Sequence, residues 1–300
     1  MEFRPKKCEV CGISLSEGDK FCPMCNKPVE SSKSRFMSLK SISRKRPGMI
    51  LISGIVIGTM ILASAIYTTQ YLDDWNAKGK NALTSENYNE AIEDFNKALK
   101  LNPSSEDALN GLGDAYYNLI KSEGNQYNLP LSYYDKANKC NKTGNSTYAL
   151  KKMGMIDLSK ENYNNSKEKF QRIINQNKIS RSDLADAWYN KGKAFWKLND
   201  PQEAIKCFNE AITILKGEVN SQTQYQAFLS LYLGSIGEVL FKEGKTDKAS
   251  QYYENALDTD TNCQDCSHFC ENLIKIYENS NRTEEAEKYK KKCPENFWNK

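Results

Sequence analysis

Apolar residues follow two patterns along the chain, one continuous and one periodic. Residues 48–67 are continuously uncharged and mostly apolar. Twenty residues of α-helix rise about 30 Å, which matches the hydrocarbon thickness of a bilayer. From Leu72 onward, apolar residues instead recur at intervals of three and four, the period of amphipathic helices. The pattern predicts a transmembrane helix over residues 48–70 and an all-α region over residues 72–300.

The charges that flank the apolar segment predict its orientation. Residues 31–47 form a Ser-rich linker with six basic side chains and no acidic one, and the positive-inside rule places such a flank in the cytoplasm. The region after the segment would then lie outside the cytoplasm. A cleaved signal peptide is the alternative, because Ala63-Ser64-Ala65 resembles a cleavage site. The long N-terminal region before it favours an uncleaved signal anchor.

Two glycines within the apolar segment bear on the oligomeric state. Gly54 and Gly58 are four residues apart, a spacing that lets two membrane helices approach closely. A homodimer through this helix is one interpretation. The other is that these glycines are ordinary, because glycine is frequent in membrane helices.

The periodic region contains a recurring pair of helical segments. In the second segment of a pair, an aromatic residue follows a small residue by four positions and precedes a small or apolar residue by three. These spacings place all three on one helix face. The sets are Ala91/Phe95/Ala98, Ser166/Phe170/Ile173, Ala204/Phe208/Ala211 and Ala249/Tyr253/Ala256. The first segment carries Gly79, Gly192 or Gly237, and glycine inside a helix predicts close contact with another helix.

This combined pattern, with Trp and Gly in the first helix and Ala, Phe and Ala in the second, resembles the tetratricopeptide repeat (TPR). The resemblance implies an all-α superhelix of stacked helix pairs. We expect about six repeats, in the ranges 72–105, 106–144, 147–180, 185–218, 230–263 and 267–297. The second has an insertion around residues 121–126. The last is degenerate, with Ile274 at the glycine position and Lys290 at the aromatic position, as suits a solvent-facing cap.

The resemblance also implies a binding site. TPR proteins bind extended peptides or partner helices in a concave groove, lined by the first helix of each repeat. By position, the lining residues expected here are Asn76, Lys80, Asn110, Asp114, Tyr117, Lys151, Tyr189, Lys193, Trp196, Glu238 and Phe241. The alternative for each of them is an ordinary solvated helix face. The set lacks the Lys/Asn pattern of the clamp that binds chaperone C-termini, so we expect a different protein or peptide partner.

Four cysteines near the N-terminus form two C-x-x-C pairs. Ten residues separate Cys8 and Cys11 from Cys22 and Cys25. Two such pairs can close a tetrahedral thiolate site around a structural Zn²⁺, and a segment as small as residues 1–30 needs the metal to fold. The segment resembles the short zinc ribbons of many prokaryotic membrane and regulatory proteins. Two disulfides or a rubredoxin-type iron site are the alternatives, although a reducing cytoplasm disfavours disulfides.

Six further cysteines lie in the periodic region, where an extracytoplasmic location would permit disulfides. They are Cys140, Cys207, Cys263, Cys266, Cys270 and Cys293. Cys270 falls near the start of the last repeat's first helix and Cys293 near the end of its second. Antiparallel packing would bring these ends together, which makes a Cys270–Cys293 disulfide one interpretation. A metal site formed by Cys263, Cys266, His268 and Cys270 is another.

Charge and composition limit the remaining function classes. Residues 1–46 hold 11 basic and 5 acidic side chains, whereas residues 47–300 hold 31 and 33. Basic character is therefore confined to the N-terminal region, and we expect no nucleic-acid binding. With a single histidine and no phosphate loop or nucleophile–base pair in the sequence, we expect no enzyme. The prediction is a non-catalytic membrane scaffold; a transmembrane regulator that couples partner binding to the zinc ribbon is the second hypothesis.

Overall fold

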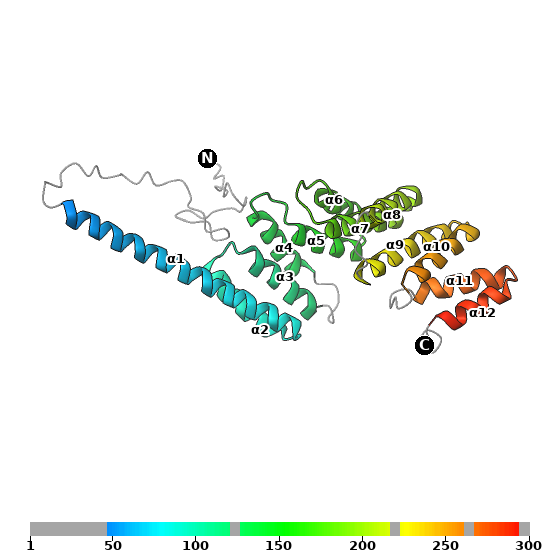
Figure 1. Cartoon of the computed structure of the whole chain (residues 1–300), viewed down its shortest axis with the longest axis horizontal. Helices are drawn as coiled ribbons and strands as arrows, with labels where there is room; N and C mark the ends of the chain where they lie inside the picture. Colours follow the sequence, from blue (N-terminus) through cyan, green and yellow to red (C-terminus); the bar gives the residue numbers. More distant parts are fainter. Residues whose placement is uncertain (1–46, 121–126, 217–222, 261–266, 294–300) are drawn as a thin grey trace, which may run out of the picture. The chain divides into compact units, whose positions relative to one another are not determined.

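The computed structural model describes residues 47–120, 127–216, 223–260 and 267–293, with the backbone alone for residues 47–65 and 223–224. These described residues form twelve α-helices (Figure 1), so the predicted all-α fold of the repeat region is confirmed. Several predictions lie outside the described residues: the zinc site of Cys8, Cys11, Cys22 and Cys25, the basic linker, the insertion at residues 121–126, and the states of Cys263 and Cys266.

The chain divides into two compact units, residues 1–149 and 150–300. The first unit contains α1 (Pro47–Thr84), α2 (Tyr88–Leu101), α3 (Glu106–Ile120), α4 (Asn128–Cys140) and the start of α5 (Thr147–Ser159). The second unit contains the rest of α5 and then α6 (Tyr163–Ile174), α7 (Arg181–Lys197), α8 (Pro201–Lys216), α9 (Thr223–Lys242), α10 (Thr246–Thr259), α11 (Ser267–Asn279) and α12 (Thr283–Lys292). Consecutive helices form antiparallel pairs, so each repeat expected from the sequence corresponds to one pair.

Helix α1 combines two segments that the sequence pattern separates. It runs from Pro47 to Thr84 without interruption, so the apolar segment and the first helix of the repeat region form one helix with no break near residue 71. Among the residues whose side chains are described, no helix is long and apolar enough to span a bilayer. The predicted transmembrane segment lies outside that set up to residue 65.

An aromatic ring packed against a glycine holds each of five helix pairs together. A Cβ atom placed on Gly192 of α7 would lie only 2.6 Å from Phe208 Cε1 of α8, and Phe208 is 1% exposed. The other four contacts join Gly79 to Phe95, Gly113 to Tyr134, Gly154 to Phe170 and Gly237 to Tyr253. Because no other residue permits so close an approach, the contact predicted from the recurring glycines is confirmed.

The helix faces predicted from the small–aromatic–small spacing form the core. All twelve of the predicted side chains are buried, with relative exposures of at most 1% where they are apolar and 0% for Ser166. The start of α8 is also encoded locally, because Asp200 Oδ1 accepts a hydrogen bond from the Glu203 N–H at 3.2 Å and Pro201 is the first helical residue. The sequence pattern thus specifies both the buried face and the helix start.

The turn between the two helices of a pair also recurs. Glu86, Glu161, Asn199, Gly244 and Asn281 occupy equivalent places in five turns, and each has a positive φ, from 56° to 74°. This left-handed conformation costs roughly 1–2 kcal/mol for a residue other than glycine. Its recurrence gives these pairs the same tight connection even where the residue is not glycine.

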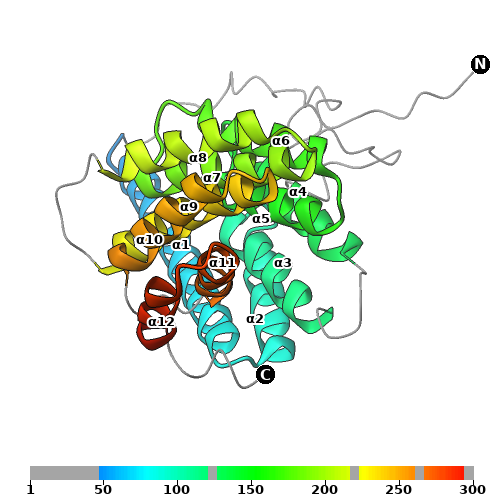
Figure 2. The same cartoon turned by 90° about the vertical axis from the view of Figure 1, so that its right-hand side faces the viewer.

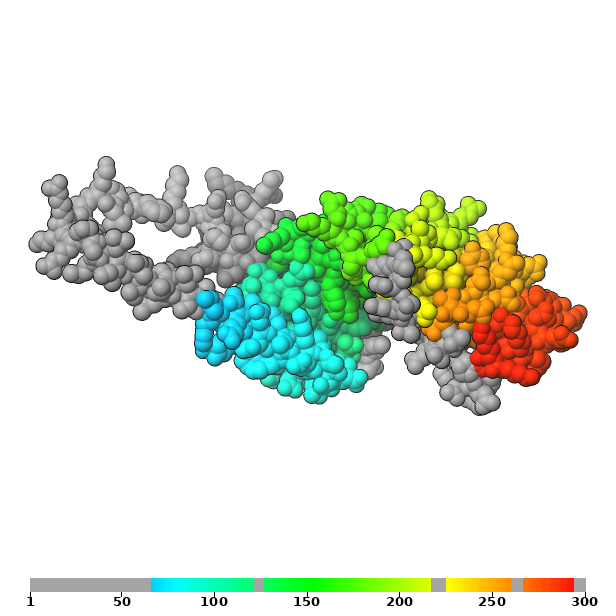
Figure 3. All heavy atoms as spheres, in the orientation of Figure 1, coloured from blue at the N-terminus to red at the C-terminus, as the bar shows by residue number. Residues whose placement is uncertain are grey.

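The last helix pair departs from the pattern. Figures 1 and 2 show α11 and α12 side by side, and Figure 3 shows their outer surface in orange and red. Ile274 replaces the glycine, and α12 buries only Ala286 and Tyr289. The predicted degeneracy is confirmed, because Lys290 stands nine residues after the turn residue Asn281, as Phe208 does after Asn199. The neighbouring Tyr289 supplies the buried ring, and Lys290 forms ion pairs at the surface, because a charged side chain remains hydrated.

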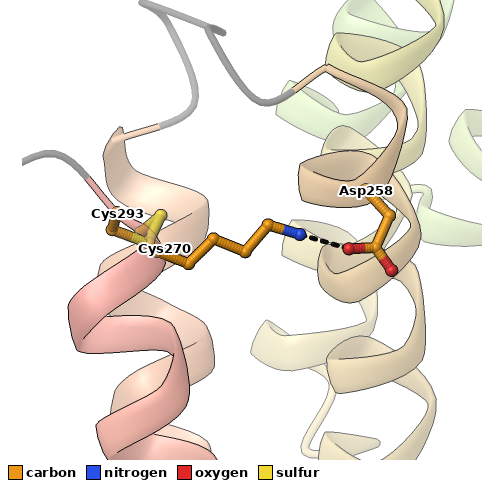
Figure 4. The surroundings of a disulfide bond; sticks show 4 residues. Asp258, Cys270 and Cys293 are labelled. Atoms are coloured by element: carbon orange, nitrogen blue, oxygen red, sulfur yellow. Dashed lines mark hydrogen bonds and ion pairs between the residues drawn. A yellow bond between two sulfur atoms is a disulfide. The ribbon is translucent and has the colours of Figure 1, made fainter.

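A disulfide joins the two helices of this last pair. Cys270 of α11 and Cys293 after α12 are bonded, with Cα atoms 6.3 Å apart, and both are 3% exposed (Figure 4). The predicted pairing is therefore confirmed. Lys292, next to Cys293, also forms an ion pair with Asp258 of α10. Cys270 is thus unavailable for the alternative metal site with His268, and the described residues contain no cluster of three metal-binding side chains.

Candidate binding cleft in the second unit

A cleft with a volume of about 780 Å³ lies within the second unit. Its walls come from α5, α7, α9 and α11, the first helices of four successive pairs. The lining residues are Lys151, Met155, Ser182, Asp186, Tyr189, Asn190, Lys193, Phe228, Leu231, Tyr232, Ser235, Glu238, Ser267 and His268. The first helices therefore share a concave surface, as the sequence leads us to expect.

Aromatic side chains form the floor of this cleft. The rings of Tyr189 and Tyr232 stack with their centroids 4.5 Å apart, and Phe228 stacks on Tyr232 at 6.3 Å. The hydroxyl oxygens of Tyr189 and Ser235 are 3.3 Å apart, within hydrogen-bonding distance. Burial raises the pKa of Tyr232, so its hydroxyl remains neutral. Because Tyr189 and Tyr232 are 8% and 2% exposed, the floor is rigid and largely apolar.

The charged side chains of the cleft differ in how they are neutralised. Lys151 and Asp186 form an ion pair with each other. Lys193 is exposed and has no ion pair within the described part of the chain. Partial desolvation by its neighbours lowers the pKa of its ammonium, although the nearby Asp186 and Glu238 oppose that effect. Glu238 Oε2 lies 3.9 Å from His268 Nε2. The cleft therefore contains one neutralised pair and two charges of opposite sign without a close permanent counterion.

Four of the residues predicted to line a groove lie in this cleft, and two from the same helices do not. Those in the cleft are Lys151, Tyr189, Lys193 and Glu238. Trp196 and Phe241 are instead partly buried against the hydrophobic core of the second unit, and Lys242 Nζ lies 5.4 Å from the Trp196 ring centroid. Trp196 and Phe241 therefore contribute to packing of the core rather than to the cleft.

The remaining predicted residues lie in the first unit, where three make local contacts. Lys80 forms an exposed ion pair with Asp107 at 2.8 Å. The Tyr134 hydroxyl donates a hydrogen bond to Asp114 Oδ1 at 2.7 Å, and Tyr148 donates to the other carboxylate oxygen. Tyr117 stacks on Tyr127 with ring centroids 5.8 Å apart. These contacts link neighbouring helices of the unit.

Asn76 and Asn110 are buried, unlike most groove-lining residues. They are 6% and 8% exposed, and their side-chain oxygens have no hydrogen-bond partner among the described residues. An unsatisfied buried acceptor costs about 1–3 kcal/mol. The two amides therefore destabilise the first unit unless a donor reaches them.

Three residues of the cleft floor, Phe228, Leu231 and Tyr232, are not among the lining residues predicted from the sequence. Phe228 lies before residue 230, where the expected fifth repeat begins, and Leu231 and Tyr232 are its first residues after Ser230. Helix α9 begins earlier, at Thr223, so its first turns extend beyond the repeat consensus. The apolar run around Phe228 to Leu233 is the signal that could have revealed this extension.

The geometry defines the class of the protein: antiparallel helix pairs, five of them joined by a glycine–aromatic contact, and four first helices that line a shared surface. Comparison with known families gives the particular repeat. Residues 83–119 match the model described as TPR repeat, and residues 185–216 and 232–263 match two models described as tetratricopeptide repeat. The chain contains tetratricopeptide repeats in these segments.

A curated relative supports the same conclusion. The TPR repeat-containing protein MJ1428 of Methanocaldococcus jannaschii is 25% identical over 193 residues, which cover 60% of this chain and 31% of the relative. The match therefore spans about a third of the relative's length.

Solved structures share the fold. Pseudomonas aeruginosa PilF superimposes with a TM-score of 0.57 at 17% identity, over 74% of this chain and 90% of PilF. PilW, described as a widely conserved type IV pilus biogenesis factor, gives a TM-score of 0.59 at 15% identity, over 73% of this chain and 90% of PilW. At these identities the likeness concerns the fold alone.

Proposed function

We propose that this chain is a non-catalytic, membrane-anchored TPR scaffold that binds a protein or peptide in the cleft of its second unit. The observation that carries the proposal is the cleft itself, which combines a rigid aromatic floor with two charges that lack a close permanent counterion. Apolar surface and a few convergent polar groups are typical of binding sites. The match to TPR family models and the fold shared with solved TPR structures also support a peptide-binding role.

Selection from a random peptide library tests the binding role directly. The full-length chain in detergent micelles is expected to enrich specific peptides from displayed dodecapeptides. Leu231→Asp, which places a charge on the partly exposed apolar floor, should abolish this enrichment. Leu198→Asp is the matched control, because Leu198 is 37% exposed and does not line the cleft. Failure of the wild type to enrich any peptide over empty micelles would refute the binding role.

The membrane anchor rests on the uncharged segment 48–67 and on the helix that contains it. Just beyond this segment, Tyr67 and Tyr71 are 59% and 41% exposed, and their hydroxyl oxygens are 2.7 Å apart. Exposed tyrosines are enriched where a membrane helix leaves the bilayer. The Cys270–Cys293 disulfide agrees with an oxidising, extracytoplasmic location for the repeats.

Protease protection of intact cells tests the proposed orientation, with a tag after Lys300. Digestion of the tag from outside is expected. A tag that is protected in intact cells but digested in lysates would place the repeats in the cytoplasm.

The N-terminal segment is proposed to be a cytoplasmic zinc ribbon, on the basis of the spacing of Cys8, Cys11, Cys22 and Cys25. Elemental analysis of the purified full-length chain should give one zinc per chain. Cys22→Ser should lose this metal, whereas Cys140→Ser, outside the two C-x-x-C pairs, should retain it. Iron in place of zinc would contradict the assignment.

A transmembrane regulator is the second candidate, and the continuity of α1 favours it. Because α1 runs unbroken from Pro47 into the first helix pair, a movement of that pair would be transmitted along a single rigid helix. Homodimerisation through Gly54 and Gly58 belongs to this candidate. Ligand-dependent crosslinking of two chains within the apolar segment would favour the regulator; crosslinking that is independent of ligand would favour the simple scaffold.

A further inference from the structure

The two charges of the cleft without a close permanent counterion occupy equivalent places in adjacent repeats. Lys193 directly follows Gly192 in α7, and Glu238 directly follows Gly237 in α9. Both glycines pack against the second helix of their own pair. The two charges are therefore held at one edge of the cleft by the backbone contacts that close the repeats.

These two side chains do not neutralise each other. Lys193 forms no ion pair in the described part of the chain; it is exposed, and its Nζ lies 5.6 Å from the centroid of the Tyr189 ring. Glu238 Oε2 lies 3.9 Å from His268 Nε2. The cation of Lys151, by contrast, is already matched by Asp186. A ligand that supplies the opposite charge at each position would therefore add a charge-assisted contact to both side chains.

The remaining lining determines what lies between the charges. Tyr189 is one helical turn before Lys193, and Phe228, Leu231 and Tyr232 lie on the earlier turns of α9. The half-exposed Met155 of α5 adds an apolar wall. An apolar side chain placed on this surface would bury its area against rigid rings. The lining thus requires an amphipathic occupant.

We propose that Lys193 and Glu238 form a bipolar clamp that selects peptides with an acidic and a basic side chain flanking an apolar residue. Neighbouring helices pack about 10 Å apart, and an extended peptide advances about 3.3 Å per residue, so the two ligand charges would be about three residues apart. The acidic side chain contacts Lys193 and the basic side chain contacts Glu238. This inference rests on the proposed peptide-binding role and specifies the ligand for it.

Peptide selection on charge-reversed variants of the full-length chain tests the clamp. The wild type is expected to enrich dodecapeptides with the acid–apolar–base pattern. Lys193→Glu should replace the acidic consensus position with a basic one, and Glu238→Lys should do the reverse at the other position. The binding of a wild-type consensus peptide should weaken by about tenfold in each variant.

A charge reversal at an exposed lysine outside the cleft provides the matched control. Lys197 is unsuitable, because its charge acts on Lys193, so the control variant is Lys248→Glu. Lys248 is exposed on α10 and does not line the cleft, so this variant should enrich the wild-type consensus. Enriched peptides without a charge pattern, or with a pattern that Lys193→Glu and Glu238→Lys leave unchanged, would overturn the clamp while leaving the binding role intact. The absence of any enrichment on the wild type would instead refute both.

Discussion

Two helix pairs of the second unit close in different ways. In α7 and α8, the ring of Phe208 packs directly on the backbone at Gly192. In α11 and α12, Ile274 occupies the glycine position and the Cys270–Cys293 disulfide joins the helices. The interior pair has neighbours on both sides, whereas α12 buries only two side chains.

The difference shows two ways in which a helix pair can be stabilised. Among the described residues, α7 and α8 contact helices on both sides, whereas the pair of α11 and α12 contacts only helices that precede it. A covalent bond between its two helices compensates by restricting the unfolded chain. The closure of the last repeat should therefore depend on redox conditions, while the closure of the interior pairs should depend on steric fit.

The largest expected effect comes from filling the glycine contact of the interior pair. Gly192→Val should destabilise the second unit by about 3 kcal/mol, because its side chain would overlap the buried ring of Phe208. Thermal unfolding of the full-length chain followed by circular dichroism measures the loss. Combining Gly192→Val with Phe208→Leu should restore part of the lost stability, because the smaller side chain makes room for valine. If the loss in the double variant equals the sum of the losses in the two single variants, the cause is not steric.

Removal of the disulfide should have a smaller and more local effect. Cys270→Ser with Cys293→Ser should destabilise the last pair by about 2 kcal/mol. Hydrogen exchange followed by mass spectrometry should show faster exchange in α11 and α12 and little change in α7 and α8. Treatment of the wild type with a reductant should reproduce this pattern. Uniform acceleration across the second unit would contradict the local role of the disulfide.

The tight turn between the two helices has the same conformation in both pairs, so substitutions in the two turns should have similar effects on stability. Asn199 and Asn281 adopt φ values of 60° and 56°, a region that a β-branched residue tolerates poorly. Asn199→Val and Asn281→Val should each cost about 1 kcal/mol. Unequal losses, measured by the same unfolding experiment, would show that the two connections differ as well as the two closures.

The smallest expected effect on stability comes from the cleft. Lys193→Gln should leave the unfolding temperature nearly unchanged, because this side chain contributes no ion pair within the described residues and its partial desolvation lowers the pKa of the ammonium. The same change should impair the binding of acidic peptides. A large loss of stability would mean that Lys193 has a structural role.

The contacts that join the two helices of a pair can be predicted from the sequence in some repeats but not in others. Gly192 and Phe208 are predictable because a regular repeat fixes their spacing, and the Cys270–Cys293 pairing follows from antiparallel helices. Alignment to the repeat places Lys290 at the aromatic position but does not reveal that the neighbouring Tyr289 supplies the buried ring, because that depends on which side chain reaches the core. Phe228 was missed because α9 is longer than the repeat consensus.

The most direct test of the binding role is photocrosslinking in intact cells. A benzoylphenylalanine residue at position 228 lies on the cleft floor, whereas the same residue at position 198 lies outside the cleft. The account predicts a discrete crosslinked adduct from position 228, lost when Leu231→Asp is added, and none from position 198. No adduct from position 228, or equal adducts from both positions, would contradict it.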